Sequence, residues 1–251
     1  MKYLKTGVML LFVTIFVTAM SGMAFAEEVS SEQEEQVSLE EIQTNFPTVT
    51  LLENGHVAGY EATVDAEDMT TDELIAMYES PVEEYEVENE TGTHYLEIYA
   101  DGTYSAYGVL DDESEEDTIA LASSSSGSEG TSSNRKIYWN QGATAGTYKM
   151  YYYVKCGANA SKLATVSKTS QTISIVSCTG TLPSLGYTIA SGSVVIDTAS
   201  QSSSSSSAKA HSTAVVSLNG VRNFGMKLTV NVKRNSSTGA FTYSVSTAIT
   251  G

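Results

Sequence analysis

The stretch FGMKLTVNVK, residues 224–233, decides the fold class of this chain. Its apolar residues Leu228, Val230 and Val232 alternate with polar residues. In an extended strand, such alternation places the apolar side chains on one face and the polar side chains on the other. A period of two therefore predicts a β-strand with one buried face.

Further strands follow from the same pattern on both sides of this stretch. The candidate strands are 136–139, 147–156, 163–168, 172–178, 187–197, 213–218 and 241–249. Turn signals such as Asn219-Gly220 separate most of them. About eight short strands at this spacing are typical of an antiparallel β-sandwich or barrel, which we expect over residues 135–251.

The preceding part of the chain mixes helices and strands. Ser38 with Glu41, and Thr70 with Glu73, each have the spacing of a capping box at a helix N-terminus. Strands are expected at 48–52, 57–64, 82–87, 94–99 and 104–110. Asn54-Gly55 and Asp101-Gly102 predict tight hairpin turns. We therefore expect a small acidic α+β domain over residues 38–110, so that the whole protein is mainly β.

Three other segments are expected to lie outside the two folded domains. Residues 1–26 have a positive start, an apolar core and an A-x-A end, which predict a secretory signal peptide and an extracellular, secreted protein. Residues 27–37 are acidic and predict disorder. Residues 111–134 are acidic and then rich in Ser and Gly, which predicts a linker or a processing site. After signal cleavage, no segment is expected to span a membrane.

Charge divides the chain sharply at Arg135. Residues 27–134 hold 29 of the 30 carboxylates and no lysine or arginine, a formal charge of −29. Residues 135–251 hold 11 lysines and arginines and one carboxylate, Asp197, a charge of +10. Such a division predicts something about partners rather than about fold. In an exported protein, it points away from nucleic acid and toward an anionic cell-surface polymer, a glycan or a host partner.

Cys156 and Cys178 are the two cysteines of the chain. In an exported protein, a pair of this kind favours a disulfide, with two buried free thiols as the other interpretation. The bridge would close a loop worth about 3 kcal/mol in the chain-entropy model. Two cysteines without nearby histidines do not make a structural zinc site.

Residues 172–232 also resemble a group of known sequences. The stretches that carry the resemblance are ISIV at 173–176, TLPSL at 181–185, GSVVI at 192–196 and the Ser/Ala-rich run that leads into AVV at 214–216. They resemble small secreted all-β domains of unknown function from Gram-positive bacteria. The resemblance implies an extracellular location and an all-β fold, and it carries over no catalytic residues.

One candidate binding site emerges from alternation in the strand 147–156. Lys149, Tyr151, Tyr153 and Lys155 share one face of that strand. Tyrosines can stack on sugars and lysines can pair with phosphate or carboxylate, so an exposed stripe of this kind could bind an anionic wall polymer or glycan. The alternative is that the tyrosines are buried under another layer.

The sequence shows no recognised catalytic or metal-binding motif. His56, His94 and His211 do not fall in a recognised nucleophile or zinc motif, and Asp197 is the single carboxylate of the basic part. The acidic run that begins at Asp111 lacks the spacing of an EF-hand loop. No cofactor or metal site is expected, and an enzyme is disfavoured.

Two functional hypotheses remain, with a third behind them. The first is a secreted non-catalytic binding protein that associates with an anionic surface polymer or a host partner. The alternative is an acidic pro-region whose removal at 111–134 frees a basic effector, similar to a bacteriocin or a toxin. An extracellular hydrolase is third.

Overall fold

The structure is a computed structural model that describes residues 37–66, 68–89, 91–111, 133–143, 146–168, 175–179, 187–218 and 222–251. The stretch from Val37 to Gly251 forms one compact unit. The predicted signal peptide lies outside the described residues, as do residues 27–36 and most of the predicted linker.

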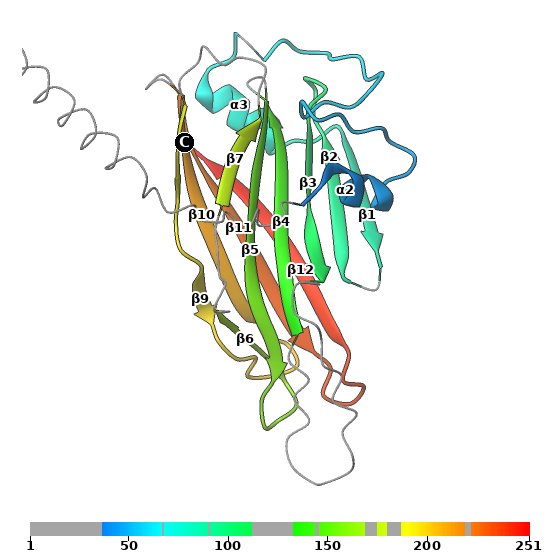
Figure 1. Cartoon of the computed structure of the whole chain (residues 1–251), viewed down its shortest axis with the longest axis vertical. Coiled ribbons are helices and arrows are strands. Elements are labelled where there is room, and N and C mark those ends of the chain that lie inside the picture. Colours follow the sequence, from blue (N-terminus) through cyan, green and yellow to red (C-terminus); the bar gives the residue numbers. More distant parts are fainter. Residues whose placement is uncertain are drawn as a thin grey trace, which may run out of the picture. The chain divides into compact units, whose positions relative to one another are not determined.

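Two antiparallel sheets make this unit mainly β, as predicted (Figure 1). The first sheet, within the described residues, has the order β1-β2-β3-β4-β5-β6, and β7 also pairs with β5. Its strands are β1 (Glu83–Glu88), β2 (Thr93–Ile98), β3 (Tyr104–Asp111), β4 (Ser133–Ala143), β5 (Gly146–Ala158), β6 (Ala164–Lys168) and β7 (Ile175–Thr179).

The second sheet has the order β12-β11-β10-β8, and β9 also pairs with β10. Its strands are β8 (Tyr187–Ser191), β9 (Val195–Thr198), β10 (Ala208–Leu218), β11 (Arg222–Arg234) and β12 (Phe241–Thr250). The expected strand 187–197 is thus two short strands, which pair with different parts of β10.

The main core lies between the two sheets. Met150, Tyr152 and Val154 of β5 pack there against Leu228 and Val230 of β11. These are the residues whose alternation predicted inward faces. Burying a large apolar side chain contributes about 1.5–3 kcal/mol, so this layer is a major source of stability.

A second core lies on the other side of the first sheet. The helix α2 (Leu39–Asn45) and the chain that follows it bury Ile42, Phe46 and Leu51 against that sheet. Figure 1 shows α2 beside β1 and β2. Val37, which was expected to be disordered, is 2% exposed and belongs to this core.

Both predicted capping boxes are confirmed. The Ser38 hydroxyl accepts from the Glu41 backbone N–H, and the Glu41 carboxylate accepts in return from Ser38 at the start of α2. Thr70 and Glu73 do the same for α3 (Thr71–Tyr78).

The expected strands 48–52 and 57–64 are not regular strands, although the chain does reverse at Asn54-Gly55. Across this turn, Leu51 and Val57 form one bridge, and the Ala58 N–H donates to the Thr50 carbonyl at 2.8 Å. The turn itself also bonds to the first sheet. The Gly55 carbonyl accepts from the Tyr104 backbone N–H at 3.0 Å. Gly55 has φ +85° and lies so close to β4 that a Cβ on Gly142 would be 2.0 Å from its carbonyl oxygen.

The division into an α+β domain and a separate β domain also differs from the structure. β3 pairs along its length with β4, so residues from both sides of the expected boundary form one sheet. Tyr107 and Val109 of β3 are buried in the core between the sheets. The ends of the expected linker are strand residues: Asp111 ends β3, and Ser133 begins β4.

Candidate functional site

The predicted stripe on β5 is not an exposed binding surface. Lys149, Tyr151, Tyr153 and Lys155 do share one face of the strand, as predicted. Tyr151 is 2% exposed and Tyr153 is 8% exposed, however, because both pack under the segment that contains α2. Lys155 is exposed and Lys149 is partly exposed. The two tyrosines therefore stabilise the fold.

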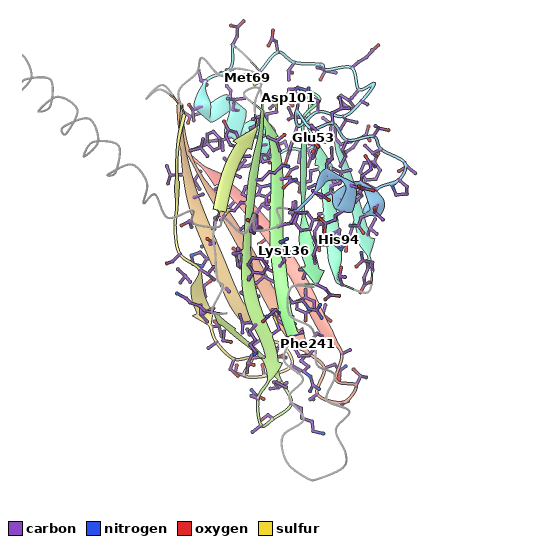
Figure 2. The ribbon with its side chains drawn as sticks, viewed as in Figure 1. Glu53, Met69, His94, Asp101, Lys136 and Phe241 are labelled. Atoms are coloured by element: carbon purple, nitrogen blue, oxygen red, sulfur yellow. The ribbon has the colours of Figure 1, made fainter. Side chains whose placement is uncertain are left out.

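Lys136 of β4 belongs to the same buried layer. Its ammonium lies 5.5 Å from the centre of the Tyr151 ring and 5.7 Å from that of Tyr153. Figure 2 shows Lys136 on β4. Cation–π attraction strengthens when the cation is removed from water, which offsets part of the cost of burying this lysine.

The predicted disulfide is wrong, because Cys156 is a buried free thiol. The register of β5 with β7 places the backbone of Cys178 opposite Tyr148, eight residues along β5 from Cys156. Eight residues of strand span about 27 Å. A disulfide requires Cα atoms within about 7 Å. Burial raises the pKa of the Cys156 thiol to about 12, so it stays protonated and unreactive at neutral pH.

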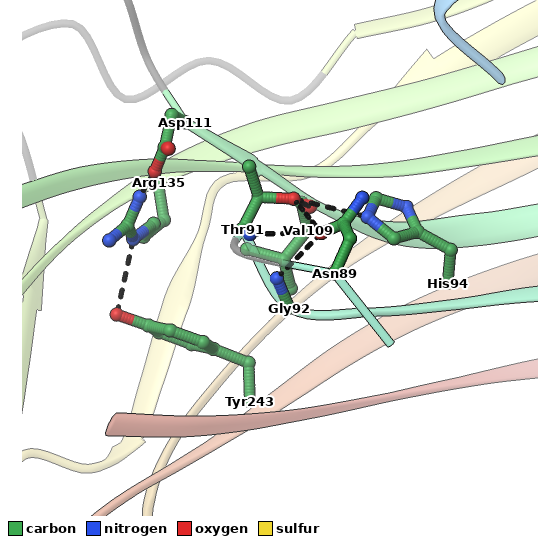
Figure 3. Close-up of polar contacts among 8 residues, drawn as sticks. All are labelled: Asn89, Thr91, Gly92, His94, Val109, Asp111, Arg135 and Tyr243. Carbon is green, nitrogen blue, oxygen red and sulfur yellow. Dashed lines mark hydrogen bonds and ion pairs between the residues drawn. The ribbon is translucent and has the colours of Figure 1, made fainter. Parts of the chain in front are cut away.

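His94 is buried in a polar cluster at the outer face of the first sheet (Figure 3). Its Nδ1 lies 3.0 Å from the Tyr138 hydroxyl, and its Nε2 lies 3.1 Å from the Thr91 hydroxyl. A neutral ring satisfies both contacts when Nε2–H donates to Thr91 and Nδ1 accepts from Tyr138. Burial lowers the pKa of His94 to about 4. Because the ring lies in a closed cluster, His94 has a structural role.

Arg135 joins the two sheets nearby. It forms an ion pair with Asp111, and its Nε donates to the Tyr243 hydroxyl at 3.1 Å (Figure 3). Asp111 was expected at the acidic start of the linker 111–134. It ends β3, and its half-exposed carboxylate balances the guanidinium at the edge of the core.

His56 lies beside an open pocket that Asp65 and Asp101 also line. Asp101 already accepts from the backbone N–H of Thr103 at 3.0 Å and from its hydroxyl at 2.6 Å. This carboxylate therefore holds the turn between β2 and β3, which is the turn that Asp101-Gly102 predicted.

The second sheet has an open outer face, which we call the candidate binding face. We define it by polar outward residues of β10, β11 and β12 and the neighbouring part of β9: Asp197, Lys209, His211, Lys227, Thr229, Asn231, Lys233, Ser244 and Ser246. The exposed side chains of Val195, opposite His211, and of Val215 on β10 lie on the same side of the sheet. Lys227, Lys233, Ser244 and Ser246 are exposed, and Thr229 is buried among its neighbours.

The register arranges this face in rows across the strands. His211, Thr229 and Ser246 form one row, and Lys209, Asn231 and Ser244 form the next. Lys227 lies one row before the first of these, and Lys233 one row after the second. Residues directly opposite each other in neighbouring strands are about 5 Å apart at Cβ. The face therefore has lysines toward both ends along the strand direction, and exposed Val195 lies beside the His211 row.

Asp197 and His211 are hydrogen-bonded to each other on the β9–β10 side of the face. The Asp197 Oδ2 lies 2.8 Å from the His211 Nδ1. This pair uses the single carboxylate of residues 135–251. The three lysines Lys209, Lys227 and Lys233 therefore dominate the electrostatic character of the face.

The described acidic residues are not confined to one part of the fold. Glu84, Glu86 and Glu88 are exposed on β1, at the edge of the first sheet. The helix α3, whose first turn holds Asp72 and Glu73, contacts β11 and β12. The first sheet also carries lysines on β5, so the charge division of the sequence is not a division between the two sheets.

The sequence does hold a pattern that predicts this face, although it matches no motif. In the stretch 224–233, the polar residues that alternate with the apolar ones are Lys227, Thr229, Asn231 and Lys233. They lie on β11, in the middle of this face. The β5 stripe drew attention because it holds tyrosines. Aromatic residues on a strand are more often buried, whereas a face of Lys, Thr and Asn is more often open to solvent.

The fold and this face define the class of protein as an antiparallel β-sandwich with one outer face covered and the other open. Comparison with protein-family models, curated proteins and solved structures found no match to this chain. Among the described residues, no helix has the length and apolar character needed to cross a membrane. Those residues also contain no cluster of three or more His, Cys, Asp or Glu side chains fit to hold a metal ion.

Proposed function

We propose that this protein is a secreted, non-catalytic binding protein whose candidate binding face associates with an anionic polymer of a cell surface. The observation that carries the proposal is the open outer face of the second sheet, where Lys209, Lys227 and Lys233 lie around the hydrogen-bonded Asp197–His211 pair. The predicted signal peptide supports the extracellular location.

The net charge of the chain, −17, does not oppose this binding at close range. At physiological salt the Debye length is about 8 Å, so charges on the far side of the molecule are largely screened. A polymer in contact with the face therefore experiences mainly the local lysines. The distant carboxylates keep the molecule soluble and disfavour polymer contacts on other surfaces.

Neutralising the three lysines tests the proposal. Each lysine near an anionic surface contributes about 1 kcal/mol, so K209Q/K227Q/K233Q should weaken binding about a hundredfold. The purified protein and this variant would be compared for binding to immobilised polyphosphate at physiological salt.

A matched control has the same change in net charge on the first sheet. K149Q/K155Q/K168Q removes three lysines of the first sheet, including both lysines of the stripe predicted from the sequence. We expect it to bind within about threefold of the unmodified protein. The proposal fails if the two triple variants lose binding equally, or if only the control loses it.

A further inference from the structure

The lysines of the candidate binding face lie at two places along the strand direction. The distance between these places limits which ligands can reach all of them. Lys227 lies toward one end of β11, and Lys233 lies six residues further along the same strand. Six residues of strand span about 20 Å. Lys209 lies diagonally beside Lys233, since its direct partner is Asn231. The face thus has two cationic ends that are separated along the strand direction.

The centre of the face has a different chemistry. In the neutral His211 ring, Nδ1–H donates to the Asp197 carboxylate, so that Nε2 carries the lone pair. A phosphate diester has no proton to donate to that lone pair, and the nearby carboxylate repels its charge. A hydroxyl group can donate to it. Ser244 and Ser246 add exposed hydroxyls on β12, within the rows that contain His211 and Lys209.

From this arrangement we infer that the ligand is a linear phosphodiester polymer with hydroxyl-bearing polyol units, bound lengthwise along β11. Phosphates pair with the lysines at the two ends, and the polyol hydroxyls bond to the centre. This inference rests on the function proposed above and names the ligand class for the same face.

The same face disfavours nucleic acid, which is also a phosphodiester polymer. Binding of single strands relies largely on aromatic side chains that stack on bases. Among the outward residues of β10, β11 and β12 whose side chains are described, none is aromatic; they are Lys, His, Thr, Asn, Ser, Val, Ala and Gly. Proteins that read the bases of a DNA duplex insert a helix or a two-stranded ribbon into the groove, and the face of a sheet does not fit there in the same way.

Affinity measurements with defined probes test the inference. The probes are a poly(glycerol phosphate) oligomer longer than about 20 Å, a shorter one, inorganic polyphosphate of matched charge, and a single-stranded oligoribonucleotide. We expect the long poly(glycerol phosphate) to bind about tenfold more tightly than the short one, and more tightly than the oligoribonucleotide, because only the long oligomer reaches both ends.

Two variants test the centre separately from the ends. H211A and S244A/S246A each remove hydrogen bonds to polyol hydroxyls and should weaken poly(glycerol phosphate) binding about three- to tenfold. Their binding to polyphosphate should stay within about twofold. S244A/S246A changes only exposed side chains, so it keeps the test valid if H211A does not fold. S237A, in the turn before β12, is the matched control and should change neither affinity.

The outcomes separate this inference from the proposed function. If no polyanion binds, the proposed function itself is wrong. If polyphosphate binds but the short and long poly(glycerol phosphate) oligomers bind equally, or the centre variants leave their affinity unchanged, only the inference is overturned. Tighter binding of the oligoribonucleotide than of poly(glycerol phosphate) would also overturn it.

Discussion

At the scale of single residues, the structure separates two histidines that looked alike in the sequence. His94 and His211 both lie on strands. His94 is closed in a cluster with Tyr138 and Thr91, whereas the His211 side chain is 15% exposed and hydrogen-bonded to Asp197. The first therefore affects stability, and the proposal gives the second a role in binding.

Burial of His94 predicts a loss of stability in acid. Its pKa is lowered to about 4 in the folded protein, from about 6.5 in an unfolded chain. The unfolded state therefore binds the proton first, so stability that is present above pH 6.5 is lost as the pH falls toward 4. Between pH 7 and pH 5 the loss should be about 2 kcal/mol.

Denaturant unfolding at several pH values checks this prediction in the unmodified protein and in H94Q. The variant keeps every other titrating group, so the difference between the two pH profiles reports His94 alone. H94Q should be less stable at pH 7 and should lose about 2 kcal/mol less between pH 7 and pH 5. Parallel pH profiles would contradict the assignment of a neutral, buried ring.

At the scale of strands and helices, β3 decides how the acidic and basic parts of the chain are related. It pairs with β2 on one side and with β4 on the other, and it contributes Tyr107 and Val109 to the main core. A cut between β3 and β4 therefore does not release a basic domain. The hypothesis of a freed effector would require a whole strand to be withdrawn from the middle of a sheet.

A designed cut tests this relation. A specific protease site inserted after Ser124, between β3 and β4, should give two fragments that elute together on size exclusion in native buffer. They should separate only in denaturant, because seven residue pairs join β3 to β4 and the core side chains interlock. Uncut protein with the same insertion is the control. A folded fragment of residues 133–251 that elutes alone would instead support the effector hypothesis.

Much of this level of structure was predictable from local patterns. Capping boxes predicted the starts of α2 and α3, and alternation predicted which side chains of β5 and β11 enter the main core. Packing between distant segments was not predictable in the same way. Nothing local in Tyr151 or Tyr153 shows that the chain around Ile42 and Phe46 covers them. The pairing of β3 with β4 was likewise hidden, since the acidic run between them resembles a linker.

At the scale of the whole folded unit, the two sheets differ in what covers their outer faces. The α2 segment packs on the outer face of the first sheet. The second sheet has exposed lysines on its outer face. The proposed function therefore depends on these local lysines rather than on the net charge of −17.

Lysine footprinting on the unmodified protein tests the central claim most directly. The rate of acetylation of each lysine is measured by mass spectrometry with and without saturating poly(glycerol phosphate) or polyphosphate. We predict that Lys209, Lys227 and Lys233 become protected, while Lys149, Lys155 and Lys168 react at unchanged rates. Protection of the second group without the first would show that the polymer binds the first sheet and would contradict the assigned face.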